Sequence, residues 1–353
     1  MNIKTDEQKI ENMLSLLYEW YPKAARDLPW RMDIDPYHVW ISEIMLQQTR
    51  VEAVKEYYKR FLECLPTIGD LASVDEELLL KLWQGLGYYN RARNLKKAAG
   101  QIVERYGGVF PDSYEEIRAL PGIGNYTAGA IGSTCFELST PAVDGNVLRV
   151  YARVMAYKEN IDRQAVKNDV TKRLAGAYKK GYCRLATQSL MELGATVCVP
   201  NGAPHCEICP LASICESRSN MEWKNLPVRS PKKKRKIVDM TVFVLRCGGE
   251  LAIRKRPKQG LLSGLWEFPH VEGVFEKQQA ADIATKWSVS PDRIWMESHY
   301  THIFSHVEWR MTAYYFDCFT RNEDFVWVTR AKLQETYALP SAFMPFFDKL
   351  TTD

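Results

Sequence analysis

Apolar residues recur at three- and four-residue spacing through the first half of the chain, which predicts a succession of amphipathic helices. In the first of them, at positions 7–21, Ile10, Leu14 and Leu17 share one face, and we expect Pro22 to end the helix. Further helices are expected at 36–49, 54–62, 76–83, 95–106, 163–179 and 185–193. The pattern therefore predicts an all-helical amino-terminal region.

The pattern changes after a run of basic residues at 229–236. The elements expected beyond it are strands at 237–246, 250–256 and 307–319, a helix at 276–287 and a loop at 301–306. Gly248 and Gly249 are expected to turn the first two strands into a β-hairpin. The basic run is typical of a solvated, extended linker, although a nuclear-import signal has the same pattern. We thus expect a second domain of α/β character.

Composition bounds the size and setting of the protein. The 353 residues, 46% of them hydrophobic, are enough for the cores of two or three domains. The formal net charge is only +4, so a surface that binds a polyanion must be a local patch. No apolar run approaches the roughly 18 residues needed to cross a membrane. We expect a cytoplasmic protein without a membrane segment.

Nine cysteines occur, and four of them are clustered. The other five are scattered, which favours reduced thiols. Cys198, Cys206, Cys209 and Cys215 are separated by seven, two and five residues. Four thiolates at such spacing can enclose zinc or a [4Fe–4S] cluster, and the spacing alone does not choose between them.

A Pro-Gly-x-Gly turn at 121–124 joins a short helix that ends near Ala119 to a small-residue helix at 127–133. The two glycines, Gly122 and Gly124, would let backbone N–H groups point outward at a helix N-terminus, where a phosphate is favoured. An ordinary turn between helices has the same pattern. Taken with the other motifs, the helix-hairpin-helix indicates contact with a nucleic-acid backbone.

Two carboxylic acids stand out. Glu43 lies among Trp40, Ile44 and other apolar residues, so on the inner face of its helix it would be desolvated and its pKa raised. A neutral acid near pH 7 can donate a proton. On the outer face it would be an ordinary solvated Glu. Asp144 precedes a helical run at 145–153 and is expected to be its N-cap, which is compatible with facing a site shared with Glu43.

Two loops carry aromatic and basic residues. Positions 26–31 form a proline-containing loop with two arginines and Trp30, which would otherwise be a surface turn with one buried Trp. The segment 85–93 combines two glycines, adjacent tyrosines and two arginines at a helix start, which suits close approach to DNA. A turn with a solvated basic face fits the latter segment equally well.

Together these motifs resemble the MutY-type adenine DNA glycosylases. The resemblance is carried by 28–31 (Leu-Pro-Trp-Arg), 42–49 (Ser-Glu-Ile-Met-Leu-Gln-Gln-Thr), 85–89 (Gly-Leu-Gly-Tyr-Tyr), the hairpin, 143–147 (Val-Asp-Gly-Asn-Val), the four cysteines, 264–269 (Gly-Leu-Trp-Glu-Phe-Pro) and 304–306 (Phe-Ser-His). It implies an all-α helix-hairpin-helix DNA glycosylase region with a [4Fe–4S] cluster, linked to an α/β Nudix-like C-terminal domain. The implied substrate is adenine mispaired with 8-oxoguanine or guanine in duplex DNA.

The resemblance also implies domain ranges. Residues 1–28 and 137–220 would form the iron–sulfur helical subdomain, and 29–136 the six-helix subdomain with the hairpin. Residues 221–238 would link them to an 8-oxoguanine recognition domain at 239–353. The helix at 276–287 contains only Glu276 and Asp282 as acids, so the Mg²⁺-binding helix of true Nudix hydrolases is missing. Recognition without nucleotide hydrolysis is expected there.

Roles for individual residues follow from the same resemblance. The residues implied for catalysis are Glu43, Asp144, Tyr126 and Asn146. Glu43 would be the acid that protonates adenine N7, and Asp144 would be the carboxylate that stabilises the cationic sugar. The implied adenine pocket consists of Leu28, Trp30, Arg31, Leu46 and Gln188. The implied DNA contacts are Gln48, Thr49, Leu86, Tyr88, Gly122 and Gly124. The implied readers of 8-oxoguanine are Phe304, Ser305 and His306, and the implied cluster ligands are Cys198, Cys206, Cys209 and Cys215.

One position separates this chain from endonuclease III relatives that also cleave the strand. Those enzymes carry a lysine two residues after the second hairpin glycine, and its amine forms a Schiff base. Here the residue is Tyr126, and a phenol cannot form an imine. We therefore expect base excision without β-lyase activity. The first cysteine gap is one residue longer than the six usual in the family, with Asn201 and Gly202 as a suitable place for an insertion.

Two other functions remain as alternatives. An endonuclease III-like glycosylase/lyase would share the hairpin, Asp144 and the cluster, but Tyr126 and Glu43 argue against it. A non-enzymatic iron–sulfur DNA-binding sensor would need no buried acid. We expect a monomer whose partner is duplex DNA with an 8-oxoguanine:adenine or guanine:adenine mispair, associated with the nucleoid in a bacterium.

Overall fold

A computed structural model describes residues 3–219, 221–231 and 234–350 of the chain. Lys232 and Lys233 of the basic run lie outside the described residues, as do positions 1–2, 220 and 351–353 of the expected domain ranges. The chain divides into two compact units, Met1–Ser73 with Asn94–Pro231 and Val74–Arg93 with Lys232–Asp353. The four domain ranges expected from the sequence stay predictions.

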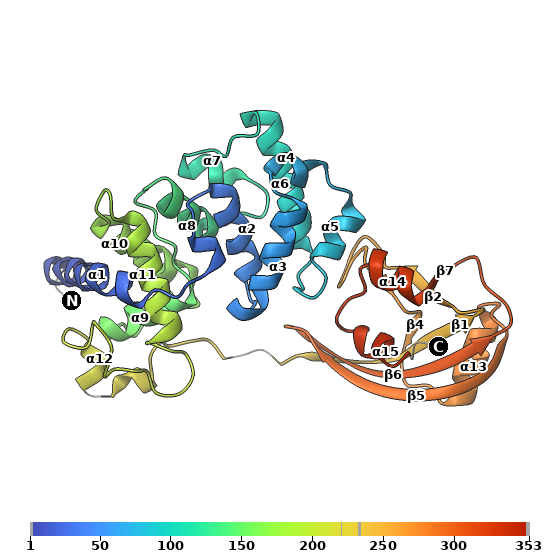
Figure 1. The fold of residues 1–353 in the computed structure, drawn as a ribbon. Helices are drawn as coiled ribbons and strands as arrows, with labels where there is room; N and C mark the ends of the chain where they lie inside the picture. Colours follow the sequence, from blue (N-terminus) through green and yellow to red (C-terminus); the bar gives the residue numbers. More distant parts are fainter. Residues whose placement is uncertain (1–2, 220, 232–233, 351–353) are drawn as a thin grey trace. The chain divides into compact units, whose positions relative to one another are not determined.

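The first unit is helical (Figure 1). Its elements are α1 (Ile3–Ala24), η1 (Pro29–Arg31), α2 (Pro36–Leu46), α3 (Val51–Cys64), α4 (Ile68–Ser73), α6 (Asn90–Tyr106, which begins in the second unit), α7 (Tyr114–Ala119), α8 (Asn125–Cys135), α9 (Gly145–Val154), α10 (Gln164–Ala177), α11 (Cys183–Thr196), α12 (Glu216–Ser219) and η2 (Glu222–Lys224). Every helix predicted in this region is present, and the short α4 was not predicted. No helix in the described ranges is both long enough and apolar enough to cross a bilayer.

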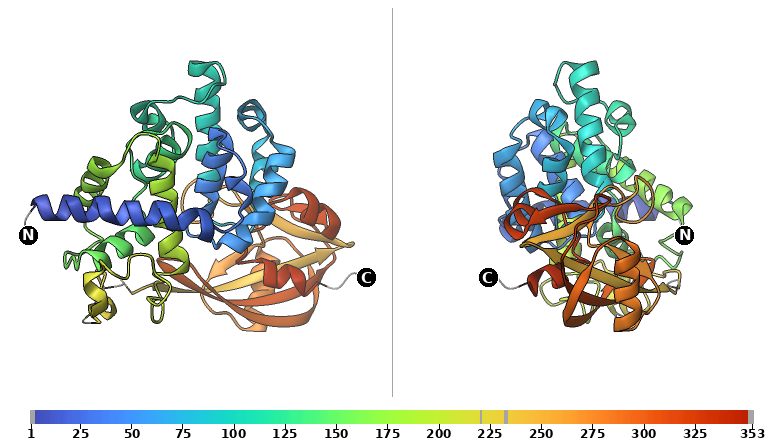
Figure 2. Two further views of the ribbon diagram at one scale, coloured as in Figure 1. Left: turned by 60° about the vertical axis from the view of Figure 1, so that its left-hand side comes forward. Right: turned by 90° about the vertical axis from the view of Figure 1, so that its right-hand side faces the viewer.

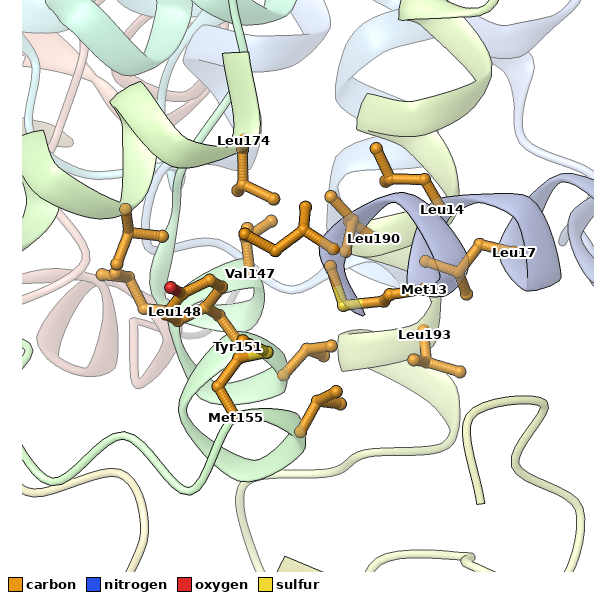
Figure 3. Close-up of a cluster of buried hydrophobic side chains, with 14 of the residues drawn as sticks. Met13, Leu14, Leu17, Val147, Leu148, Tyr151, Met155, Leu174, Leu190 and Leu193 are labelled. Carbon is orange, nitrogen blue, oxygen red and sulfur yellow. The ribbon is translucent and has the colours of Figure 1, made fainter. Parts of the chain in front are cut away.

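The core of this unit joins helices that are distant in the sequence. Met13, Leu14 and Leu17 from α1 pack beside Val147 and Tyr151 from α9, with further side chains from α10 and α11 (Figure 3). These five side chains are at most 1% exposed. Each one fully buried stabilises the fold by about 1.5–3 kcal/mol. This core fixes α9 and α11, which carry site residues.

Two of the predicted helix ends that differ from the structure have a clear physical reason. α1 continues past Pro22 to Ala24, because a proline in the last turn removes only its own N–H hydrogen bond from the helix. The Ala25 N–H then donates to the Tyr21 carbonyl at 2.9 Å. α2 ends at Leu46 rather than at Thr49. Gln47 leaves the helical region, and Gln48 has a left-handed φ of 60°, so the chain turns there.

The second unit is built on a twisted sheet with the strand order β3-β2-β1-β6-β5. Its elements are α5 (Glu76–Leu82), β1 (Lys236–Cys247), β2 (Glu250–Lys255), β3 (Trp266–Glu267), β4 (His270–Glu272), α13 (Lys277–Lys286), β5 (Pro291–Ile303), β6 (Val307–Cys318), β7 (Val326–Thr329), α14 (Arg330–Thr336) and α15 (Met344–Asp348). The predicted hairpin is confirmed, with Arg246 paired to Leu251 and Cys247 to Glu250. β1 runs parallel to β6, and β5 antiparallel to β6.

Both faces of β1 are covered, which explains its continuous buried run. Met240, Val242 and Val244 face α15, whereas Phe243 and Leu245 face α13. Figure 2 shows these two helices on opposite faces of the sheet. Strand β5 was not predicted, and it overturns part of a predicted loop at 301–306. Residues 301–303 pair with β6 and extend the strand, so only 304–306 form the turn.

Candidate active site

One cleft of the helical unit gathers residues from six elements. Its cavity volume of about 530 Å³ lies within the about 300–1,000 Å³ of typical small-ligand pockets. The cleft is lined by Glu43, Tyr126, Asp144 and Asn146 and by all five residues expected in the adenine pocket, Leu28, Trp30, Arg31, Leu46 and Gln188. Gln48 and Thr49 line it as well. The structure therefore brings together residues that are far apart in the sequence, while their roles stay predictions.

Glu43 lies on the buried face of α2, where Asp35 caps the helix and Pro36 starts it. Its neighbours Trp40, Ile44 and Met45 are at most 3% exposed, and Glu43 itself is 9% exposed. The solvated interpretation of Glu43 is therefore wrong. Burial raises the pKa of Glu43 to about 7, although the hydrogen bond from Tyr126 opposes the shift.

Tyr126 occupies the first turn of α8, directly after the hairpin. Its hydroxyl donates to Oε2 of Glu43 at 2.8 Å, and it also contacts the sulfur of Met191. Burial, followed by the charges of Glu43 and Asp144, raises the pKa of Tyr126 well above its ordinary value. Tyr126 is thus a neutral phenol that orients the Glu43 carboxyl group.

Asp144 is the N-cap of α9, as predicted. Its Oδ1 accepts the backbone N–H groups of Asn146 (2.9 Å) and Val147 (2.8 Å), and its Oδ2 accepts the Asn146 side-chain amide at 2.7 Å. Burial raises the pKa of Asp144, and these hydrogen bonds oppose the shift by favouring the carboxylate. These hydrogen bonds hold the Asp144 carboxylate in place at the wall of the cleft that Glu43 also lines.

A buried arginine behind this cap was not predicted from any sequence pattern. The guanidinium of Arg149 donates to the carbonyl oxygens of Cys198 (2.7 Å) and Gly194 (2.6 Å) and to Oδ1 of Asn146 (2.8 Å). Arg149 is 4% exposed, and burial lowers its pKa. It joins the first clustered cysteine to the residue that holds Asp144.

A second set of missed residues supports the cleft wall. Glu192, fully buried on α11, accepts hydrogen bonds from Arg26 (2.7 Å from Nε) and Arg31 (2.7 Å), and these bonds hold the pKa of Glu192 at about 2 against the opposing effect of burial. One turn earlier, Gln188 accepts the hydroxyl of Tyr21 at 2.7 Å. The spacing of Gln188 and Glu192, four residues apart on one helix, was the available signal.

The four clustered cysteines line a separate cavity of about 430 Å³. Its other walls are mainly apolar, and Arg153 donates to the sulfur of Cys198 at 3.4 Å. Burial raises the pKa of Cys209 to about 12 and also raises that of Cys206 and Cys215. No three His, Cys, Asp or Glu side chains in the described ranges converge closely enough to hold a metal ion. Four thiols around one apolar cavity nevertheless fit a thiolate-bound group.

The expected DNA contacts differ in exposure. Gly122 has a φ of 79°, and a Cβ there would lie 2.7 Å from the Cβ of Asn94, so only glycine fits. Gly124 is the exposed N-cap of α8. Tyr88 is 49% exposed, whereas Leu86 is only 6% exposed. The structure thus presents the tyrosine at the surface and buries the leucine.

The residues expected to read 8-oxoguanine form the turn between β5 and β6. The Phe304 N–H donates to the Val307 carbonyl at 2.9 Å, which closes the turn, and Arg235 donates to the Phe304 carbonyl at 3.0 Å. Ser305 is exposed and is hydrogen-bonded to Tyr88 of the same compact unit. His306 is also exposed.

The helical fold and its hairpin define the class of protein. Residues 41–175 match the HhH-GPD superfamily of base excision DNA repair proteins, and residues 241–349 match the NUDIX domain. A solved non-covalent endonuclease III–DNA complex has a similar fold, with a TM-score of 0.53 and 27% identity over 61% of this chain and 97% of that one.

The relatives are more specific. The adenine DNA glycosylase of Rattus norvegicus is 34% identical over 84% of this chain and 69% of its own length. That of Buchnera aphidicola subsp. Baizongia pistaciae is 38% identical over 72% of each protein. The chain belongs to the adenine DNA glycosylase (MutY) family and is a base excision repair enzyme, which confirms the resemblance seen in the sequence.

Proposed function

We propose that this enzyme hydrolyses the N-glycosidic bond of adenine opposite 8-oxoguanine or guanine in duplex DNA, after the adenine has been flipped out of the helix. The proposal rests above all on Glu43. It is a buried acid with a pKa of about 7, oriented by Tyr126, in one cleft with the Asp144 carboxylate. The size of the cleft suits an extruded nucleotide.

The two acids support distinct steps. Protonated Glu43 gives its proton to adenine N7, so that the C1′–N9 bond breaks with its electron pair on a neutral leaving base. The sugar is left as an oxocarbenium-like cation, which the Asp144 carboxylate stabilises. Water then adds at C1′ and yields an abasic site. Asn146 holds Asp144 by two hydrogen bonds, which favours its charged form.

The same cleft supports excision without strand cleavage. Tyr126 occupies the hairpin position, and lysine is not among the residues that line the cleft in the described ranges. Because no amine among the described residues lines this cleft, we expect no Schiff base with the sugar. Strand breaks are therefore expected only after the abasic site is treated with alkali.

Recognition of the opposite base is assigned to other residues. Gln48, Thr49 and Tyr88 would enter the duplex beside the orphaned base, and the backbone around Gly122 and Gly124 would bind phosphate. Because Leu86 is buried, its side chain is the least suited of the expected contacts. Phe304, Ser305 and His306 would inspect the 8-oxoguanine.

The four clustered cysteines would hold a [4Fe–4S] cluster. When bound, the cluster would cross-link the 198–215 loop, and Arg149 and Arg153 would fix that loop against α9 through the carbonyl and sulfur of Cys198. Iron and sulfide analysis of purified protein, with the broad visible absorbance of such clusters, tests this assignment. Stoichiometric zinc without that absorbance would contradict it.

Single-turnover cleavage tests the reaction. The substrate is a duplex with adenine opposite 8-oxoguanine, the control has adenine opposite thymine, and each is read with and without hot alkali. We expect alkali-dependent breaks at the mispaired adenine alone, abolished in Glu43→Gln although that variant still binds the duplex. Breaks without alkali would indicate a lyase, and no breaks would favour a DNA-binding sensor.

A further inference from the structure

A second cleft opens on the other side of the catalytic pair. Its cavity volume is about 520 Å³, and among the described residues it shares only Tyr126 and Asp144 with the first cleft. The remaining lining residues come from the N-terminal turns of α8 and α9, from the segments that precede α9 and α10, from α10 itself and from the segment after η2. Tyr126 and Asp144 thus form a partition with open space on both sides.

Two cations and a helix N-terminus face this second cleft, which the carboxylates of Asp144 and Asp162 also line. Gln164, Lys167, Asn168 and Thr171 lie at positions i, i+3, i+4 and i+7 of α10, so one polar face of that helix lines the cleft. The N-terminus of α8 faces it through Gly124, which has no side chain to cap that end. The unpaired N–H groups of this first turn and the helix dipole add to the charge of Lys167.

Arg229 completes the cleft from the segment expected to be a free linker. Residues 226–230 of that segment are hydrogen-bonded to the helical unit. Ile161 donates to the Val228 carbonyl (3.0 Å), Ser230 donates to Asp162 (2.8 Å), and Asn160 donates to the Ser230 hydroxyl (2.9 Å).

These bonds place the Arg229 guanidinium beside the start of α9. An added Cβ on Gly145 would lie 3.5 Å from Nη2 of Arg229. Nη1 of Arg229 also lies 3.6 Å from Oδ1 of Asp162, an exposed carboxylate that lines the same cleft and lowers its net positive charge. The cation is held at the rim, next to the Asp144 cap.

We propose that the second cleft binds the sugar–phosphate strand that continues from the flipped nucleotide, with Lys167 and Arg229 each contacting a phosphate. The inference rests on the proposed function. A base held near Glu43 places its sugar at Asp144, and the strand must leave past the partition. The second cleft is the space on that side, and it carries both cations.

Binding to an uncleavable duplex tests the proposal. The probe contains 2′-fluoro-2′-deoxyadenosine opposite 8-oxoguanine, because fluorine disfavours the cationic sugar. Lys167→Ala and Arg229→Ala are compared with Lys172→Ala, which removes an exposed lysine of the same helix that does not line the cleft. We expect each cleft variant to bind about tenfold more weakly. The slope of log K against log salt should fall by about 0.9 for each phosphate interaction that a substitution removes.

Methylphosphonate substitution locates the phosphate that each cation binds. One neutral linkage at a time replaces the phosphates that flank the adenine. When the phosphate that Lys167 contacts is made neutral, the wild type should bind the duplex as weakly as Lys167→Ala binds the unmodified duplex. The affinity of Lys167→Ala should not fall further with that neutral linkage. Affinities and slopes equal to those of Lys172→Ala, or an affinity change independent of the neutral linkage's position, would overturn the proposal. Wild-type excision is measured separately, so failure of the proposed reaction is seen independently.

Discussion

Burial determines the protonation state of Glu43 and hence the pH dependence of excision. Desolvation raises its pKa to about 7, so the proton-donating form predominates below that pH and disappears above it. We expect the single-turnover excision rate to fall about tenfold per pH unit well above pH 7. A pH–rate profile of the wild type at saturating enzyme measures this. A profile that stays flat to about pH 9 would contradict the assignment of Glu43 as the acid.

The same shift has a consequence for stability. The pKa of Glu43 is about 7 in the folded protein against an ordinary value of 4.5, so the folded state binds more protons between these values. Stability therefore falls as pH rises through this window, by about 3 kcal/mol in total. Glu43→Gln removes the buried charge and should unfold at higher temperature than the wild type at about pH 9, with little difference at about pH 5. Equal differences at both pH values would mean that the substitution acts through packing.

Two tyrosines on α1, Tyr21 and Tyr18, provide a test substitution and its control for the support of the cleft. The Tyr21 hydroxyl donates to Gln188 in the cleft, while the Tyr18 hydroxyl is buried without a hydrogen-bond partner in the described part of the chain. Tyr21→Phe frees the Gln188 amide to rotate and should cost about 1 kcal/mol in stability and about three- to tenfold in excision rate. Tyr18→Phe should leave the rate unchanged and not lower stability. Denaturant unfolding and single-turnover kinetics compare the two, and equal rates would remove Tyr21 from the support of the pocket.

Among the elements, α9 and α11 approach so closely that only a glycine fits between them. A Cβ on Gly194 would lie 2.6 Å from the Cβ of Asn146 and 3.1 Å from its backbone. Gly194→Ala should therefore displace the start of α9, which bears Asp144, costing about 1–3 kcal/mol in stability and most of the excision activity. Gly176→Ala, in α10 with no described atom within 4 Å of the added Cβ, should be neutral or stabilising by up to about 1 kcal/mol. Thermal unfolding and excision assays of both variants check this; full activity in Gly194→Ala would show that the helices separate without moving Asp144.

Periodicity predicted the elements that bury a regular face. The long helices α3, α6 and α10 and the hairpin of β1 and β2 were found, because each shows its period within a single segment. β5 was missed because Ser298 is its only buried residue, and the alternation over 297–303 places the polar or aromatic residues Ser298, Tyr300 and His302 on the less exposed face. The short α4 and β7 are stabilised by neighbours that are distant in the sequence, and local sequence patterns contain no information about such contacts.

The same limit applies to the site. Glu43 could be singled out because its apolar neighbours are adjacent in the sequence. Glu192 could be placed on the same helix face as Gln188, but its partner Arg26 is 166 residues away and could not be assigned. Arg149 binds carbonyl groups that carry no sequence signal. Motif resemblance supplied the cleft residues, whereas the arginines that hold the cleft together required the fold.

At the scale of the whole molecule, the proposed catalytic groups and the proposed reader of the opposite base lie in different compact units. Glu43 and Asp144 belong to the first unit, and Ser305 belongs to the second, where it is hydrogen-bonded to Tyr88. A hydroxyl at the tip of an exposed turn can exchange that bond for one with a damaged base, and it takes no part in the proposed adenine chemistry. Ser305→Ala should therefore lower the preference for adenine opposite 8-oxoguanine over adenine opposite guanine.

The size of this effect follows from the removal of one hydrogen bond, about 1 kcal/mol, which corresponds to a roughly fivefold fall in the ratio of excision efficiencies. Ser305→Thr keeps the hydroxyl and should retain most of the preference. Single-turnover efficiencies on the two mispairs give the ratio for each variant. Because alanine also frees Tyr88, a decrease that was equal for both mispairs would show that Ser305 acts by holding that tyrosine. A decrease confined to the 8-oxoguanine duplex requires an interaction that distinguishes the damaged base, so the ratio separates recognition in the second unit from catalysis in the first.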